Sequence, residues 1–141
     1  MLRWRLCWNN PFVHSSVVVR HSVLDAVGGY ATAVDRLVPE DYELWSRVSE
    51  VAQLANIPHV LQAYRQSPAG MSQTMRAPIL EGVVRIGTAN LSNVLRPLGS
   101  RRDAEAIVST LNGAPAPRAS RRDALRLAAL LGSVPRAIHN W

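Results

Sequence analysis

The spacing of apolar residues changes part-way along the chain, and this change limits the folds that the chain can adopt. Before residue 66, several segments alternate apolar with polar residues or are rich in β-branched residues, as strands are. After residue 75, apolar residues recur at three- and four-residue steps, as on one face of a helix. We therefore expect an α/β fold in the first part of the chain, followed by an α-helical C-terminal extension.

Three segments are predicted to be strands. Residues 2–8 alternate apolar and polar side chains, and residues 13–20 are β-branched towards their end. A third, shorter strand is expected at residues 59–65. After the second of these strands, residues 21–27 are predicted to form a short helix. This helix stops at Gly28, where a positive φ is readily adopted.

The clearest helix is predicted to begin at Pro39, because proline suits the first helical position and acids crowd the following turn. Apolar residues then recur with helical spacing as far as Ala55. The same spacing predicts further helices at residues 78–95, 101–111 and 120–131. Residues 31–38 are expected to form a loop, and residues 113–117 a linker.

All 16 basic residues are arginine, against 10 acids, which gives a net charge of +6. The arginine-only usage suggests a GC-rich, bacterial coding sequence. The excess positive charge lies in residues 96–141, the predicted helical tail. Such a tail can attract anionic lipid or nucleic acid, or it can simply form a solvated helix face. We expect no nucleic-acid partner, because the tail lacks interleaved aromatic residues and any recognisable binding motif.

Cys7 is the single cysteine, so the chain cannot form an internal disulfide or a cysteine-rich zinc site. Its apolar neighbours predict a packed thiol. The first residues lack the apolar core of a secretory signal, and no apolar run is long enough to span a bilayer. We expect a cytoplasmic protein, with contact to the inner membrane surface as an additional location.

Glu40 and Asp41 are adjacent carboxylates at the start of the predicted helix. Acids at this position commonly complement the helix dipole and accept hydrogen bonds from free backbone N–H groups. Alternatively, a carboxylate kept ionised in this way can take a proton from a substrate hydroxyl. Composition and periodicity do not choose between these two roles.

An ordered series of short motifs carries a more specific signal. The series is Asn10-Pro11-Phe12, His14-Ser15-Ser16, Val27-Gly28-Gly29-Tyr30, Glu40-Asp41-Tyr42-Glu43-Leu44-Trp45-Ser46-Arg47, Asn56-Ile57-Pro58 and Tyr64-Arg65. In order and spacing it resembles the second, acceptor-side half of a family 2 glycosyltransferase, which has the GT-A fold. The resemblance implies that residues 1–75 are this partial domain, a short mixed sheet with helices. Residues 76–141 are then the helical extension with the basic tail.

The resemblance also implies roles for individual residues. Asp41 matches the general base, which takes the proton of an acceptor hydroxyl while a sugar is transferred from a nucleotide-sugar donor with inversion. Glu40 is then expected to orient the acceptor or to cap the helix. His14 and Trp45 are candidates for substrate contact, with structural roles as the alternative, since Trp45 also lies on the apolar stripe of its helix.

The nucleotide-binding half of such an enzyme is not found in this sequence, which contains no Asp-x-Asp motif. A divalent metal (Mg²⁺ or Mn²⁺) is therefore expected only with that half, and no metal ligand is assigned in this chain. General base assistance contributes only about 10²–10⁴-fold, so we expect no useful turnover by the chain alone.

Exposed strand edges would favour self-association. A truncated product, a mis-assigned start and half of a split enzyme remain open, as does the alternative of a non-catalytic module that docks on a membrane or partner through its basic tail.

Overall fold

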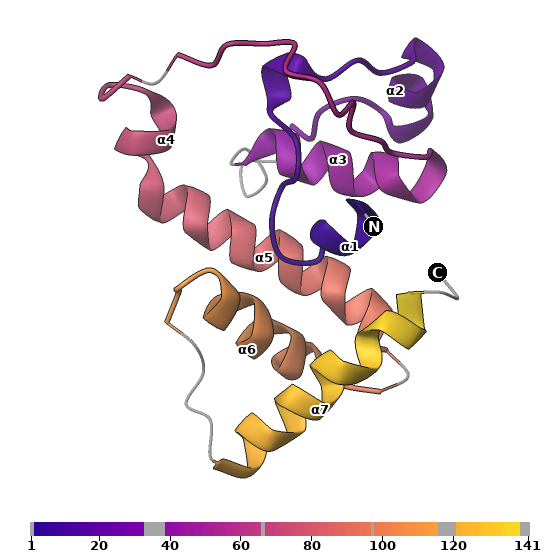
Figure 1. Ribbon diagram of the computed structural model, residues 1–141, viewed down its shortest axis with the longest axis vertical. Helices are drawn as coiled ribbons and strands as arrows, with labels where there is room; N and C mark the ends of the chain where they lie inside the picture. Colours follow the sequence, from indigo (N-terminus) through magenta and orange to yellow (C-terminus); the bar gives the residue numbers. More distant parts are fainter. Residues whose placement is uncertain (1, 33–38, 66, 97, 116–120, 139–141) are drawn as a thin grey trace.

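The computed structural model describes residues 2–32, 39–65, 67–96, 98–115 and 121–138, which form helices joined by turns and open segments (Figure 1). In chain order the elements are α1 (Leu2–Arg5), the 3₁₀ turn η1 (His14–Ser16), α2 (His21–Val27), α3 (Glu40–Val51), α4 (Met71–Thr74), α5 (Arg76–Leu95), α6 (Arg101–Leu111) and α7 (Arg121–Ile138).

The expected α/β class, with a partial GT-A-like sheet, is wrong for these residues, since no strand occurs among them. Residues 2–8 form α1 and a following turn. Residues 13–20 form η1 and an extended stretch, and residues 59–65 form neither helix nor strand. A strand exists only when its backbone is paired with another, and the described part of the chain supplies no partner for these segments.

The alternating pattern at residues 2–8 is also compatible with a helix, which explains the wrong prediction there. Residues four apart lie on the same side of a helix as well as of a strand. Trp4 and Trp8 are four residues apart, and their rings pack edge-to-face with centroids 4.2 Å apart. Leu6 and Cys7 are buried beside them, and burial raises the pKa of the Cys7 thiol to about 12, as expected for a packed cysteine.

The predicted helices are all present, and the ends of some are shifted. Helix α2 ends as expected at Gly28, whose φ of 74° is left-handed. Pro39 is the N-cap of α3 rather than its first residue, and the helix stops at Val51 because Ala52 turns to an extended conformation. The predicted helix at 78–95 begins two residues earlier, at Arg76, the helix at 101–111 has the expected bounds, and that at 120–131 continues to Ile138. The predicted loop at 31–38, the first residue of the helix predicted at 120–131 and the end of the linker lie largely outside the described residues.

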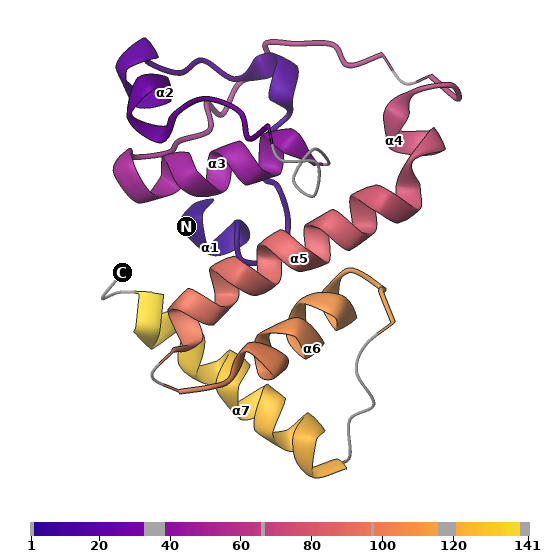
Figure 2. The same ribbon diagram turned by 180° about the vertical axis from the view of Figure 1, so that it is seen from behind.

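Helix α5 lies between two layers, with α2 and α3 on one side and α6 and α7 on the other, as both views show (Figures 1 and 2). The apolar faces of these helices enclose two clusters of buried residues. One joins α5 to α6 and consists of Cys7, Leu91, Val94, Leu95, Ala104, Ile107 and Val108. The other joins α3 to α5 and consists of Leu6, Tyr42, Leu44, Trp45, Val48 and Ile86.

The turn after α1 ties these layers together. The carbonyl oxygen of Leu6 accepts hydrogen bonds from the Tyr42 hydroxyl (2.7 Å) and from Asn90 Nδ2 (2.6 Å). Asn112 Nδ2 donates to the Trp8 carbonyl at 2.9 Å. Backbone groups of this buried turn are thereby satisfied by side chains of α3, α5 and the end of α6. The result is a fixed base for α3, whose first turn carries the candidate site.

Candidate functional site

The candidate site lies at the start of α3 and is built around the half-buried carboxylate of Asp41. Asn10 Nδ2 donates to Asp41 Oδ2 at 2.8 Å. The Phe12 N–H donates to Asn10 Oδ1 at 3.0 Å, which fixes the orientation of the Asn10 amide. The Tyr42 N–H donates to the other oxygen, Asp41 Oδ1, at 2.7 Å. Two motifs far apart in the sequence therefore meet at one carboxylate.

Aromatic rings gather beside this carboxylate. The Tyr30 hydroxyl and His14 Nε2 are hydrogen-bonded at 3.1 Å. The His14 ring lies 5.9 Å from the Trp45 ring and 5.9 Å from the Tyr30 ring, between centroids. Phe12 packs edge-to-face on Trp45 at 6.1 Å. His14 and Tyr30 are exposed, whereas Trp45 is only 3% exposed, so the ring set has an open side and a buried side.

Arg47 holds the turn that carries Tyr30 to the aromatic rings beside Asp41. Its guanidinium donates to the carbonyl oxygens of Val27 and Gly29 and forms an ion pair with Glu43 at 2.7 Å. The turn at Gly28 and Gly29 requires positive φ angles of 74° and 67°, which glycine adopts without strain. The same arginine therefore anchors the turn that brings Tyr30 to His14, and it has a structural rather than a phosphate-binding role in this structure.

Burial raises the pKa of Asp41 above its ordinary value of 3.8. The Tyr42 N–H opposes this effect because it stabilises the carboxylate, the Glu40 charge adds to it, and the proximity of His14 again lowers the pKa. The net direction is upward. A carboxylate with a raised pKa holds a proton more strongly, and this is the property that a general base needs.

All four residues predicted for the site lie at or near this carboxylate. His14 and Trp45 pack against each other, His14 is electrostatically coupled to Asp41, and Glu40 is half-buried next to Asp41. Trp45 belongs to the core cluster between α3 and α5, which matches the structural alternative for this residue. Asn10 and Tyr30 were missed as site residues, although both occur in the motifs that carried the resemblance.

An apolar groove of about 900 Å³ adjoins the site. Its walls are residues 16–20 before α2 and residues 51–57 and 59–62 after the middle of α3, together with Tyr64. Phe12 and Trp45 also line this groove, whereas Asp41 does not. The indole N–H of Trp45 is buried and has no hydrogen-bond partner among the described residues. A buried indole N–H normally has an acceptor, so the Trp45 N–H is an exception among the described residues.

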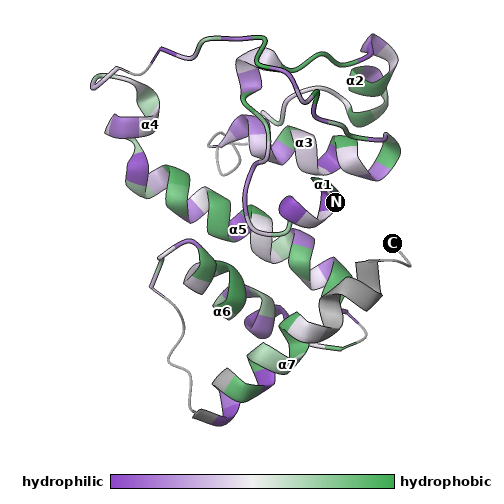
Figure 3. Cartoon of the chain, in the orientation of Figure 1, coloured by the Kyte–Doolittle hydropathy of each residue, from purple (hydrophilic) through white to green (hydrophobic). Residues whose placement is uncertain are grey.

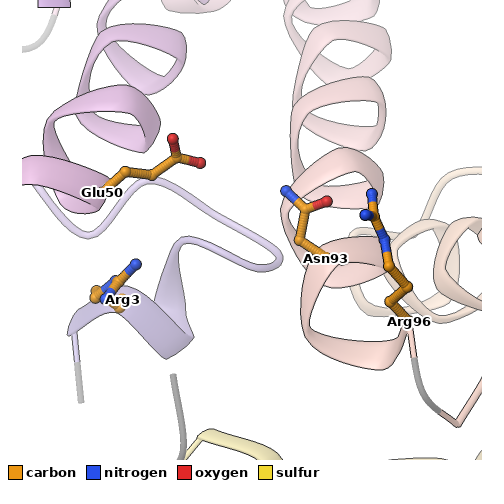
Figure 4. Close-up of a pocket in the computed structure, with 4 residues that line it drawn as sticks. All are labelled: Arg3, Glu50, Asn93 and Arg96. Carbon is orange, nitrogen blue, oxygen red and sulfur yellow. The ribbon is translucent and has the colours of Figure 1, made fainter.

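A second cavity, of about 370 Å³, lies between α1, α3 and α5 and is lined by Arg3, Glu50, Asn93 and Arg96 (Figure 4). None of the predicted site residues lines it. In the described part of the chain, no three His, Cys, Asp or Glu residues are grouped as metal ligands would be. Among the same residues, no helix has the length and apolar character that crossing a bilayer requires.

The site is therefore a half-buried carboxylate with a fixed amide donor, an exposed histidine–tyrosine pair and an adjoining apolar groove. Asp41, Asn10 and His14 come from separate motifs of the series, and the fold brings them together. Comparison with known proteins adds no relative: the chain matches no family model, no curated protein sequence and no solved structure.

Proposed function

We propose that the start of α3 is the acceptor subsite of a sugar-transfer reaction and that Asp41 is its general base. The observation that supports this most directly is the hydrogen bond between Asn10 and Asp41, which joins the first motif of the series to the Glu40-Asp41 pair. The proposal does not require a sheet in this chain, because the residues that carry it lie on α3, on η1 and in the adjoining turns.

In the proposed reaction the acceptor hydroxyl donates a hydrogen bond to the Asp41 carboxylate. As its oxygen attacks the anomeric carbon of the donor sugar, the hydroxyl proton passes to Asp41. The bond from that carbon to the nucleoside diphosphate breaks on the opposite face, the diphosphate leaves with the electron pair, and the configuration inverts. The raised pKa of Asp41 makes this proton transfer more favourable than for an ordinary aspartate.

The neighbouring side chains have positioning roles in this scheme. Asn10 holds one carboxylate oxygen in place, so that the carboxylate keeps a fixed direction. His14 and Tyr30 are exposed and hydrogen-bonded to each other, and they offer polar edges and ring faces to a hydroxyl-rich ligand. Glu40 orients the acceptor in this scheme.

In this proposal the donor is bound outside the described residues. Departure of a diphosphate requires positive charge or a divalent metal to offset the developing anion. We assign that part of the reaction, including the Mg²⁺ or Mn²⁺ ion, to a donor-binding half that completes the enzyme, in the same polypeptide or in another. The chain itself supplies the acceptor subsite and the base.

Binding of an acceptor sugar tests the proposal without the donor-binding half. We would titrate the ¹⁵N-labelled chain with methyl glycosides of glucose, galactose, mannose, rhamnose and N-acetylglucosamine and follow the amide signals by NMR. At least one glycoside should shift the signals of Tyr30, Asp41 and Tyr42. Asp41→Asn should weaken this binding about tenfold or more, because a hydrogen bond to a charged group is lost.

Glu81→Gln is the matched control, since Glu81 is an exposed acid on α5, away from the motifs. This variant should bind the glycoside as the wild type does. If no glycoside in the panel shifts the signals at the start of α3, or if Asp41→Asn binds with unchanged affinity, the proposed acceptor subsite is wrong.

A further inference from the structure

The cavity of about 370 Å³ between α1, α3 and α5 has a polar wall. The described residues that line it are all charged or polar, namely Arg3, Glu50, Asn93 and Arg96 (Figure 4). Hydrophilic residues occur on all three of the surrounding helices, as the colouring in Figure 3 shows. The volume lies within the range of roughly 300–1,000 Å³ that is usual for small-molecule sites, so the cavity can hold a small polar ligand.

The three helices around the cavity are held in fixed positions. Leu6 directly follows α1, and its carbonyl oxygen accepts hydrogen bonds from Tyr42 on α3 at 2.7 Å and from Asn90 on α5 at 2.6 Å. The Leu6 side chain also belongs to the core cluster between α3 and α5. Asn90 lies about one helical turn before Asn93. The cavity is therefore pre-formed, and a pre-formed site avoids much of the ordering cost of binding.

The charges around the cavity favour an anion. Arg3 projects from α1 into the space between α3 and α5, and Arg96 lies across this space on α5, one turn after Asn93 (Figure 4). Glu50 on α3 is the single carboxylate among the described lining residues, so one positive charge is unmatched there. Within the described ranges, the side chains of Glu50, Asn93 and Arg96 have no hydrogen bond or ion pair that a ligand would have to displace.

Glu50 restricts the kind of anion that can bind. A carboxylate repels a fully ionised anion such as sulfate, but it accepts a hydrogen bond from an anion that retains an O–H group. Inorganic phosphate retains such a group at neutral pH, whereas sulfate has none. An α-amino acid would also offer both charges, but it has no net charge and would leave the excess positive charge unmatched. The lining therefore fits a protonated phosphate best.

We propose that this cavity binds a phosphate group that retains an O–H group, either as inorganic phosphate or as a small phosphate ester. Arg3 and Arg96 donate to its oxygens, as guanidinium groups commonly do, and the Asn93 amide donates a further hydrogen bond. The phosphate O–H donates to the Glu50 carboxylate. This site is separate from the proposed acceptor subsite, because Glu50 lies about 13 Å after Asp41 along α3 and on the opposite face of that helix.

Two anions of similar size test the site on the full chain. We would titrate the ¹⁵N-labelled chain with sodium phosphate and with sodium sulfate, near neutral pH and at constant ionic strength, and follow the amide signals by NMR. Phosphate should shift the signals of Arg3, Glu50 and Asn93 in a saturable manner, and sulfate should bind about tenfold or more weakly. Arg96→Gln should weaken phosphate binding about tenfold or more, because hydrogen bonds between charged groups are lost.

Glu50→Gln tests the selectivity separately. Without the carboxylate charge, sulfate should bind more tightly, and its dissociation constant should approach that of phosphate. Glycerol 3-phosphate, titrated in the same way, distinguishes the two sources of the phosphate group. Tighter binding than that of inorganic phosphate identifies an ester as the ligand, and weaker binding identifies the free ion. Both results support the site if Arg96→Gln weakens the binding.

Arg102→Gln and Glu105→Gln are the matched controls, because both residues are exposed on α6 and neither lines the cavity. They change the net charge as Arg96→Gln and Glu50→Gln do, and they should leave the binding of both anions unchanged. All four residues are exposed, so none of the variants should unfold the chain. Three results would overturn the proposal: no saturable binding of phosphate, an equal effect of Arg96→Gln and Arg102→Gln, or an undiminished preference for phosphate in Glu50→Gln.

The phosphate experiment is independent of the sugar titration. Asp41→Asn should bind phosphate as the wild type does, because Asp41 does not line the cavity. A chain that binds phosphate but no glycoside would contradict the acceptor subsite alone. A chain that binds a glycoside but no phosphate would contradict the phosphate site alone.

Discussion

At the scale of single residues, the two roles that the sequence left open for Asp41 both find support in its surroundings. The carboxylate accepts the Tyr42 N–H at the first turn of α3, as an acid at a helix start does. It also accepts the Asn10 amide, and burial raises its pKa. The first contact is predictable from a local pattern. The second depends on the packing of two distant segments, which local spacing does not encode.

The raised pKa of Asp41 has a consequence for stability. A carboxyl group that is more basic in the folded than in the unfolded chain stabilises the fold at low pH, and this contribution is lost as the pH rises through the folded-state pKa. Relative to Asp41→Asn, the wild type should therefore lose free energy of unfolding as the pH increases from about 3.8 upward. Urea denaturation of both proteins at several pH values measures this difference.

Asp103 provides a control, because its pKa is shifted in the opposite direction. The N–H and hydroxyl of Ser100 and the charge of Arg126 hold the pKa of Asp103 below its ordinary value of 3.8. Its contribution is present above that value and is lost as the pH falls through the lower, folded-state pKa. Relative to Asp103→Asn, the wild type should therefore gain stability with rising pH. If the stability difference between wild type and variant changed with pH in the same direction for Asp41→Asn and Asp103→Asn, the environment described for Asp41 would be contradicted.

At the scale of elements, α2, α3, α5, α6 and α7 were predictable because their signals are local, whereas α1 was predicted as a strand and α4 was not predicted. Ser100 Oγ accepts from the Asp103 N–H at 3.2 Å and Asp103 Oδ2 accepts from the Ser100 N–H at 2.8 Å, so a capping box starts α6 where the sequence places it. Ala104, Ile107 and Val108 then form its buried stripe. Strands depend on partners elsewhere in the chain, and residues 59–65 lack one among the described residues. An alternating pattern therefore indicates that a segment could pair as a strand, but it does not show that the segment is paired.

The crossing of α5 with α6 gives a sharp test of this packing. A Cβ atom on Gly87 would lie 2.9 Å from Val108 Cγ1 and 3.0 Å from the Cys7 carbonyl oxygen. Gly87→Ala should therefore destabilise the chain by about 1–3 kcal/mol, although alanine is the better helix former. Gly132 in α7 has no atom within 4 Å of such a Cβ, so Gly132→Ala should stabilise by up to about 1 kcal/mol. Thermal denaturation compares the two, and equal signs would contradict the described crossing.

At the scale of the whole molecule, α5 separates the candidate site from the basic tail. The site and the groove lie with α2 and α3 on one side of α5, and α6 and α7 lie on the other (Figure 1). Leu6 and Cys7 are adjacent in the sequence but belong to different core clusters, so the turn after α1 joins the two sides. In the tail, Arg126 forms an ion pair with Asp103 at 2.9 Å, so part of the basic charge is matched within the chain.

The proposed acceptor subsite and the groove adjoin each other on the α3 side of α5, and α7 lies on the other side. The layer of α6 and α7 supports α5, and α5 in turn supports α3 through the Leu6 carbonyl and Asn90. The sequence predicted a helical extension after residue 75. It did not show that the extension packs beneath the site-bearing helix, because that contact joins segments far apart in the chain.

The pH dependence of sugar binding tests the central claim most directly. For the glycoside that binds best, the dissociation constant would be measured by NMR between about pH 4 and pH 8, for the wild type and for Asp41→Asn. Because the ionised carboxylate accepts the hydroxyl proton, wild-type affinity should rise with pH, with a midpoint above 3.8, and Asp41→Asn should lack this rise. A flat wild-type profile, or the same rise in Asp41→Asn, would contradict the assignment of Asp41 as the acceptor-side base.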